Sequence, residues 1–122
     1  MEKKRILVVD DDEVFLRLVE HDLSAAGYSI ITAKNGGEAL EFVKIQRPDL
    51  ILLDIHMPEV DGGDVGQALK NKPQTKNIPV IYLTSLVTKE EEEQIGHEIR
   101  GNVFMAKPYN LGELLEQIRK RI

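Results

Sequence analysis

Five short apolar runs, spread along the whole chain, constrain the fold more than any other feature of the sequence. They are rich in Ile, Val and Leu and barely alternate with polar residues, and they occupy residues 6–9, 30–33, 50–53, 80–83 and 103–106. Such runs are typical of strands that are buried on both faces of a parallel sheet. We therefore expect five strands whose two faces are covered by other elements.

Stretches with the period of an amphipathic helix lie between these runs. Residues 13–26 form the first, and Gly27 is its natural stop. Residues 37–46 form the second, and Pro48 ends it. The apolar residues expected on one face of the first helix are Val14, Phe15, Leu18, Val19, Leu23 and Ala26.

The last helix begins at Asn110, which forms a variant of the capping box with Glu113. Its apolar stripe consists of Leu111, Leu114, Leu115, Ile118 and Ile122. Two further helices, expected at residues 64–70 and 89–99, have weaker patterns. The first contains or follows several glycines, and Ile99 is one of only two clear apolar anchors in the second.

The alternation of strands and helices determines the class of fold. Five strands that alternate with five helices indicate repeated βα units, and hence an α/β fold. The chain has 122 residues, which suits one domain, whereas a closed barrel needs roughly twice that length. We predict an open, doubly wound five-stranded parallel sheet with helices on both faces. Ligands bind such sheets at the carboxyl ends of the strands, where the strand order reverses.

Composition argues against several classes of function. The chain has 16 basic and 21 acidic residues, so a nucleic acid is not expected as its main partner, because phosphate contacts need a basic face. It contains no cysteine, which excludes disulfides, thiolate metal sites and a cysteine nucleophile. Its longest apolar runs have four or five residues, too few to span a membrane.

Acidic residues follow two of the predicted strands. Asp10, Asp11 and Asp12 follow the first strand, and Asp54 follows the third. One Asp suffices to cap the next helix, and we assign that role to Asp12. If the two strands are neighbours, Asp10, Asp11 and Asp54 converge, and three close carboxylates require a divalent cation or raised pKa values. An oxygen-only ligand set suits Mg²⁺, and such sites usually act on phosphate.

A hydroxyl and an ammonium group follow the fourth and fifth predicted strands. Thr84 and Lys107 are each common in such places without a special role. At the same edge as three carboxylates, however, Thr84 is a candidate donor to an anion and Lys107 a fixed counter-charge. The set fits covalent phosphoryl chemistry on a carboxylate, with Asp54 as the nucleophile.

Four stretches together resemble a known family. They are ILVVDDDE (6–13), PDLILLDIHMPEVDG (48–62), IPVIYLTS (78–85) and VFMAKPYN (103–110). Their order and spacing resemble the receiver domain of two-component response regulators, of the single-domain, chemotaxis-regulator-like type. The resemblance covers essentially the whole chain, so residues 1–122 are expected to form one receiver domain. It implies a flavodoxin-like strand order, 2-1-3-4-5.

The resemblance also implies that Asp54 accepts a phosphoryl group from a partner histidine kinase or phosphotransfer protein. Mg²⁺, or Mn²⁺ in its place, would be bound by Asp10, Asp11 and Asp54 and by the backbone carbonyl of His56. The phosphorylated chain would control a protein output partner, as a cytoplasmic monomer or phosphorylation-linked dimer. It would catalyse its own phosphotransfer and autodephosphorylation without acting as an enzyme on free substrates.

Further residues match the switch of the family. The resemblance makes Thr84 and Lys107 the groups that stabilise the phosphoryl oxygens, and Thr84 with Phe104 the switch pair, although Phe104 also fits an ordinary core position. On phosphorylation, the face formed by the fifth strand and its flanking helices would change shape. The Lys107–Pro108 bond would be cis, an isomer found essentially only before proline.

Two positions tune the loss of the phosphoryl group in the family, and here they are His56 and Leu86. Leu86 cannot orient a water molecule, and apolar cover should slow hydrolysis, so we predict a long-lived phosphorylated form. His56 can accept a proton and could change the rate in either direction. The chain departs from the family pattern at HEIRGNVF (97–104) and at Gly63, where a large apolar residue is usual. Both departures concern the third and fourth predicted helices.

Three alternatives stay open. A phosphohydrolase with an aspartyl-phosphate intermediate would need an acid two residues after Asp54, where this chain has His56. It would also need a cap domain over the substrate, for which this chain has no room. A pseudo-receiver scaffold would have no reason to keep the full set of acids, hydroxyl and lysine. A piece of a longer response regulator or of a hybrid kinase would have the same sequence features as a stand-alone regulator.

Overall fold

The computed structural model describes residues 3–54, 62–84, 98–99 and 102–122. Within these residues, the elements in chain order are β1 (Arg5–Val9), α1 (Glu13–Ala25), β2 (Ser29–Ala33), α2 (Gly36–Gln46), β3 (Leu50–Asp54), α3 (Gly62–Lys70), β4 (Val80–Thr84), β5 (Glu98–Ile99), β6 (Asn102–Ala106) and α5 (Leu111–Arg119). No helix in this part of the chain combines the length and the apolar character that crossing a membrane requires.

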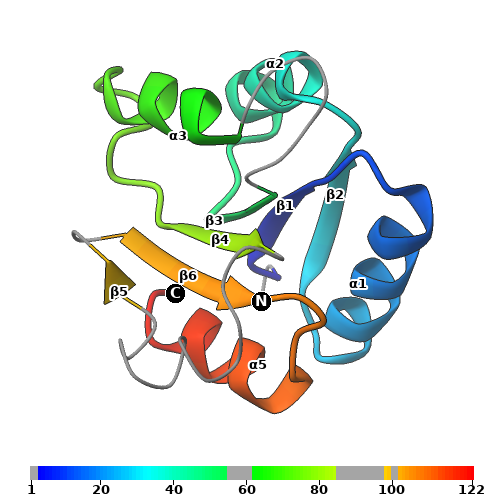
Figure 1. Ribbon diagram of the computed structural model, residues 1–122. Coiled ribbons are helices and arrows are strands. Elements are labelled where there is room, and N and C mark those ends of the chain that lie inside the picture. Colours follow the sequence, from blue (N-terminus) through cyan, green and yellow to red (C-terminus); the bar gives the residue numbers. More distant parts are fainter. Residues whose placement is uncertain (1–2, 55–61, 85–97, 100–101) are drawn as a thin grey trace.

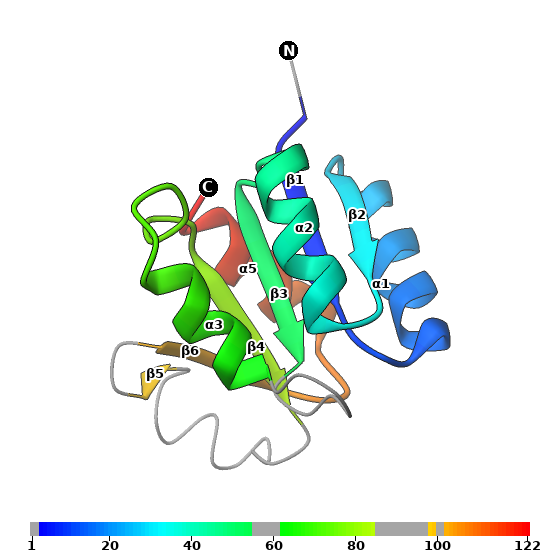
Figure 2. The ribbon, with the colours of Figure 1, turned by 90° about the horizontal axis from the view of Figure 1, so that it is seen from above.

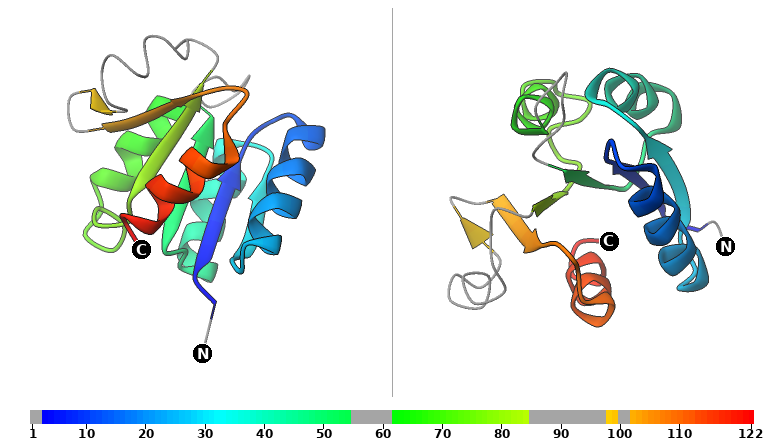
Figure 3. Two further views of the ribbon diagram at one scale, coloured as in Figure 1. Left: turned by 90° about the horizontal axis from the view of Figure 1, so that it is seen from below. Right: turned by 45° about the vertical axis from the view of Figure 1, so that its right-hand side comes forward.

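Five of the described strands run parallel in one sheet, in the order β2-β1-β3-β4-β6. Because β6 is the fifth parallel strand along the chain, this is the predicted order 2-1-3-4-5. Helices α1 and α5 cover one face, and α2 and α3 cover the other (Figures 1 and 3). The predicted doubly wound α/β fold is confirmed. The order reverses around β1 and β3, so their carboxyl ends border the expected ligand position.

The strands bury side chains on both faces of the sheet. In β3, Leu50 and Leu52 belong to the core under α1 and α5, whereas Ile51 and Leu53 belong to the core under α2 and α3. All four are fully buried, and each contributes roughly 1.5–3 kcal/mol relative to an exposed position. This two-sided burial explains why the apolar runs in the sequence do not alternate with polar residues.

The buried face of α1 differs from the predicted one. Its buried residues are Leu16, Val19 and Leu23, whereas Val14 is 69% exposed and Leu18 is 52% exposed. The prediction for Val14 and Leu18 is therefore wrong. Helical spacing of three and four residues fits two overlapping stripes here, and packing against the sheet selects the stripe that contains Leu16.

The helix ends carry the predicted capping groups. Asp12 Oδ1 accepts hydrogen bonds from two backbone N–H groups in the first turn of α1. Asn110 Oδ1 accepts one from Glu113 N at 3.0 Å, at the start of α5. Gly27 follows α1 with a φ of 102°, a left-handed conformation that favours glycine. Arg47 ends α2 with a φ of 47°, although it has a side chain.

The segment before β6 requires a second correction. Glu98 and Ile99 form β5, which pairs antiparallel with β6, whereas the sequence analysis places them at the end of a helix. Pairing with β6 satisfies backbone groups that would otherwise lie at an open sheet edge, and this outweighs a weak helical pattern. Residues 89–97 of that expected helix lie outside the described residues. The third predicted helix begins at Gly62 rather than at residue 64.

Helix α3 approaches β4 closely at Gly66. A Cβ atom at this position would lie 1.9 Å from Tyr82 Oη, so any side chain there would displace the Tyr82 ring. That ring stacks on Phe104 of β6, with 5.0 Å between the ring centroids and 19° between the planes. The missing side chain at Gly66 therefore lets α3 pack closely on the sheet at this position.

Candidate functional site

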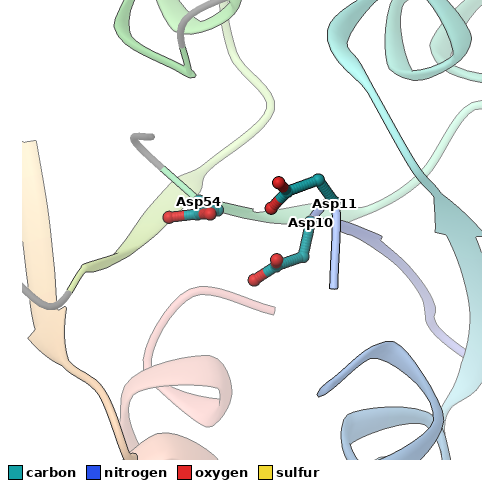
Figure 4. A group of neighbouring side chains, drawn as sticks. All are labelled: Asp10, Asp11 and Asp54. Atoms are coloured by element: carbon teal, nitrogen blue, oxygen red, sulfur yellow. The ribbon is translucent and has the colours of Figure 1, made fainter. Parts of the chain in front are cut away.

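Three carboxylates meet at the carboxyl edge of the sheet. Asp54 is the last residue of β3, and Asp10 directly follows β1, whose Val9 pairs with Leu53. Because the two strands are adjacent and parallel, these side chains and that of Asp11 lie close together (Figure 4). One carboxylate oxygen from each of the three lies within 4.8 Å of the others. The structure thus brings together the three acids that the sequence analysis singled out.

Asp10 is the most enclosed of the three acids, with 1% of its surface exposed. Its Oδ1 accepts a hydrogen bond from Asp12 N at 3.0 Å, and its Oδ2 accepts one from Lys107 Nζ at 2.5 Å. Burial raises the pKa of the Asp10 carboxyl above its ordinary value, and these two hydrogen bonds only partly oppose that shift. Burial therefore destabilises the ionised form of this carboxyl group, and a further cation would oppose that effect.

Lys107 lies between two of the acids. Its Nζ is 2.5 Å from Asp10 Oδ2 and 3.6 Å from Asp54 Oδ2. With Asp11 included, the three carboxylates exceed this ammonium by two negative charges, which a divalent cation would neutralise. All three offer carboxylate oxygens, the ligands that Mg²⁺ prefers. The residues present therefore fit a magnesium ion that would be held by Asp10, Asp11 and Asp54.

Aromatic residues that the sequence analysis did not assign to the site hold Lys107 from the opposite side. Lys107 Nζ lies 4.4 Å from the centroid of the Phe15 ring, within the range of a cation–π interaction. The Tyr109 ring meets Phe15 edge to face, and the Tyr109 hydroxyl donates a hydrogen bond to Asp22 Oδ2 at 2.5 Å. Burial raises the pKa of Tyr109, and Asp22 adds to that shift. The sequence gives one signal for these contacts. Phe15 lies a few residues after the acids, and Tyr109 lies two residues after Lys107.

The two residues predicted as the switch pair lie on neighbouring strands. Thr84 ends β4 with 1% of its surface exposed, and its backbone carbonyl accepts a hydrogen bond from Lys107 N at 3.0 Å. It directly follows Leu83, which pairs with Asp54, so Thr84 belongs to the same sheet edge as the acids. Phe104 lies two residues before that edge on β6 and stacks on Tyr82.

The remaining predicted site residues divide into two groups. The Lys107–Pro108 peptide bond is cis, the isomer that the resemblance implied. His56 and Leu86, assigned to the metal site and to the loss of the phosphoryl group, both lie outside the described residues. The described part of the site thus consists of the acids, Lys107, Thr84 and the surrounding aromatic residues.

Known proteins resemble this chain over most of its length. A family model for the response regulator receiver domain matches residues 6–119. The chain belongs to this family. The receiver domain is 36% identical to the polar-differentiation response regulator DivK of Brucella anthropi, over 95% of this chain and 94% of DivK. It is also 36% identical to the alkaline phosphatase synthesis transcriptional regulatory protein PhoP of Bacillus subtilis, but it covers only 47% of that protein.

A solved structure gives the same result for the fold. The chemotaxis protein CheY4 of Vibrio cholerae superimposes on the receiver domain with a TM-score of 0.84 and 30% identity, over 99% of this chain and all of that one. Receiver domains are the signalling switches of two-component systems, where response regulators take phosphate from histidine kinases and act on output partners. They bind Mg²⁺ at an acidic pocket, and this chain has a cluster of three acids.

Proposed function

We propose that this receiver domain is a phosphorylation-activated switch in which Asp54 accepts a phosphoryl group from a histidine kinase or phosphotransfer protein. The observation that carries the proposal is the convergence of Asp10, Asp11 and Asp54 with Lys107 at the carboxyl edge of the sheet. Clustered carboxylates are costly without a divalent cation, and a metal beside an ammonium group is suited to a transferring phosphoryl group. A cytoplasmic location belongs to the same proposal.

The chemistry that we propose is a nucleophilic displacement at phosphorus. An Asp54 oxygen forms a bond to the phosphorus of a phosphohistidine, the phosphorus–nitrogen bond breaks, and the imidazole leaves with the electron pair and takes up a proton. Mg²⁺, when bound, offsets negative charge on the phosphoryl oxygens. Lys107, 3.6 Å from Asp54, offsets it from the other side. The His56 carbonyl completes the metal ligands in this proposal.

The proposed switch connects phosphorylated Asp54 to a distant surface. The Thr84 hydroxyl moves to the new phosphoryl oxygens, and the space that it leaves admits the Phe104 ring. Phe104 stacks on Tyr82 in the structure, so this movement would have to break or shift an aromatic contact. The surface at β6 and α5 changes with it, in a two-state equilibrium that phosphorylation biases, and an output partner binds that surface.

The decisive experiment is intact mass spectrometry after incubation with acetyl phosphate and Mg²⁺. We expect one added phosphoryl group, and none in Asp54→Asn or after removal of divalent metal. Asp49→Asn is the matched control, because Asp49 lies at the opposite end of β3 and accepts a hydrogen bond from Arg5 N. A beryllofluoride titration would follow a negative result. Failure of both would indicate an interaction scaffold that carries no phosphate.

Phe104→Ala tests the switch separately from the chemistry. We expect the variant to accept a phosphoryl group on Asp54 while the phosphorylation-dependent chemical shift changes of the α5 backbone amides diminish. Tyr109→Phe is the control, since it keeps an aromatic ring close to the site but on the other face of the sheet. Unchanged amide shifts in Phe104→Ala would remove Phe104 from the switch.

The proposal includes a long-lived phosphorylated form, which rests on the residue type at Leu86. Leu86→Glu should shorten its lifetime, because a carboxylate can orient an attacking water molecule where leucine cannot. A lifetime equal to that of the parent would contradict this part of the proposal. Size-exclusion chromatography of both forms would distinguish a monomer from a phosphorylation-linked dimer.

A further inference from the structure

A cavity of about 820 Å³ lies at the end of the sheet opposite the acid cluster. Its lining residues come from the end of α2, the residues before β3, and the loop between α3 and β4 (Figure 2). Residues 50 and 54 of β3 alone are separated by about 13 Å along the strand. The cavity is therefore a separate feature from the proposed phosphorylation site. Its volume is within the range of small-molecule binding sites, roughly 300–1,000 Å³.

Positive charge surrounds this cavity. Lys44, Arg47 and Lys72 line it, and none of its lining residues is acidic. Within the part of the chain that the structure describes, none of these three cations forms an ion pair. Three unpaired cations around one cavity favour an anion, and more than one negative charge would be needed to balance them.

The backbone at Arg47 supplies an independent observation. Arg47 occupies the left-handed region, with φ 47° and ψ 68°, at the C-terminal end of α2. Glycine is the favoured residue for this conformation, because a side chain there is strained. The chain instead places an arginine, whose planar guanidinium can donate two parallel hydrogen bonds to a phosphate. Strained residues often occur at sites of function.

The cavity also has an apolar part and an ordered wall. Val43, Pro48 and Ile78 contribute apolar lining, and Ile78 is the most accessible of the three. The loop that forms the opposite wall is held by its own hydrogen bonds. Thr75 Oγ1 donates to Leu69 O at 2.5 Å, and Ile78 N donates to Thr75 O at 3.0 Å. A preformed wall reduces the entropic cost of binding a ligand.

We propose that this cavity binds a small organic phosphate of nucleotide size, with the phosphate on Lys44, Arg47 and Lys72 and the organic body on the apolar lining. A phosphomonoester carries about −1.5 to −2 charges at pH 7, which suits three cations better than a single carboxylate does. The cavity is larger than a phosphate group alone requires. The inference does not depend on phosphorylation of Asp54.

The test is a titration of the isotope-labelled protein with adenosine monophosphate, followed by backbone amide chemical shifts in the absence of divalent metal. We expect saturable shifts at Arg47, Thr75 and Ile78, with a dissociation constant below about 1 mM. The double variant Arg47→Gln, Lys72→Gln should bind about tenfold more weakly. Lys76→Gln is the matched control, because it removes a positive charge from the same loop but Lys76 does not line the cavity.

Adenosine and inorganic phosphate, titrated separately, test the two halves of the proposal, and each should bind more weakly than the complete nucleotide. Asp54→Asn should leave adenosine monophosphate binding unchanged, which separates this inference from the proposed phosphorylation. The inference is overturned if the nucleotide causes no saturable shifts up to about 10 mM, or if the double variant binds as the parent does. Equal affinity for inorganic phosphate would overturn the assignment of an organic ligand.

Discussion

The two ends of the sheet carry an excess of opposite charges, which are buried and paired at one end and exposed to water at the other. At the carboxyl end, Asp10 and Asp54 are buried, and Lys107 lies within 4 Å of both. At the amino end, Lys44, Arg47 and Lys72 are exposed around a cavity. The carboxyl-end charges lie where parallel strands end together, so the sheet itself forces them into proximity. The amino-end charges belong to a helix end and a loop, where water can still solvate each one.

This difference determines how strongly each end responds to a lost charge. A buried charge without its partner is costly, because neither water nor protein then stabilises it. An exposed charge depends little on its neighbours. The charges at the carboxyl end should therefore contribute to the stability of the fold, whereas the charges at the amino end should affect ligand binding and change stability little. Four measurements, from the largest expected effect to the smallest, test this contrast.

The same substitution at the two ends should have unequal effects. Lys107→Met leaves the Asp10 carboxylate buried without its ammonium partner, and we expect the free energy of unfolding without Mg²⁺ to fall by about 2–4 kcal/mol. Lys72→Met should change it by less than about 0.5 kcal/mol, since Lys72 is exposed. Urea denaturation measures both. Similar losses in the two variants would contradict the contrast between the ends.

Magnesium should stabilise the fold through the carboxyl end only. If the ion binds with a dissociation constant of about 1 mM, 10 mM Mg²⁺ raises the free energy of unfolding by about 1.4 kcal/mol. Asp11→Asn should abolish most of this gain, because it removes one of the three oxygen ligands. The double variant Arg47→Gln, Lys72→Gln should retain the gain. Thermal denaturation with and without the ion provides the measurement, and an equal gain in Asp11→Asn would argue against the site.

The pH dependence of stability should reveal the buried acid. The folded protein raises the pKa of Asp10 above its ordinary value of 3.8, so the folded state holds this proton more tightly than the unfolded state does. Without Mg²⁺, the contribution of Asp10 to stability is therefore lost as the pH rises from about 3.8 through the folded pKa. Asp10→Asn has no carboxyl group to ionise at this position, so it does not lose this stability as the pH rises.

The comparison that tests this prediction is the free energy of unfolding of the parent and of Asp10→Asn, measured between about pH 3.5 and pH 7. The variant should gain stability relative to the parent as the pH rises. A difference in the free energy of unfolding that stays constant across this pH range would show that burial does not shift the pKa of the Asp10 carboxyl.

The smallest expected effect is at the amino end. Arg47→Gly removes a side chain from a left-handed position, and we expect the free energy of unfolding to rise by about 0.5 kcal/mol, because relief of strain exceeds the added freedom of the unfolded chain. Gln46→Gly is the control, since the same residue placed within α2 should lower it by about 1 kcal/mol. A loss of stability in Arg47→Gly would show that the arginine serves the fold rather than a ligand.

The sequence alone was sufficient for features that depend on local pattern. The strand runs and the caps at Asp12 and Asn110 follow from residues near strand or helix ends. The convergence of Asp10 with Asp54 also required that their strands be neighbours, which the family resemblance implied. The face of α1 did not follow, because Val14 and Leu18 fit a helical stripe as well as Leu16 does. Only the position of the sheet distinguishes the two stripes.

Features built from distant residues were beyond sequence reasoning. The support of Lys107 by Phe15 depends on a helix and a loop that are 92 positions apart in the chain, and it has no motif. The cavity likewise joins Arg47 to Lys72, which are unremarkable surface residues in the sequence. The first contact joins α1 to the loop before α5, and the cavity lies between α2 and the loop after α3. No local periodicity encodes either one.

The close approach of α3 to Tyr82 at Gly66 restricts which residues position 66 can accept. Any side chain at position 66 must push the Tyr82 ring, and that ring is the stacking partner of Phe104. A larger residue on α3 would therefore alter the freedom of Phe104 without touching it. Positions 66 and 82 are therefore sterically coupled, and a larger residue at position 66 requires the side chain at position 82 to move or to become smaller.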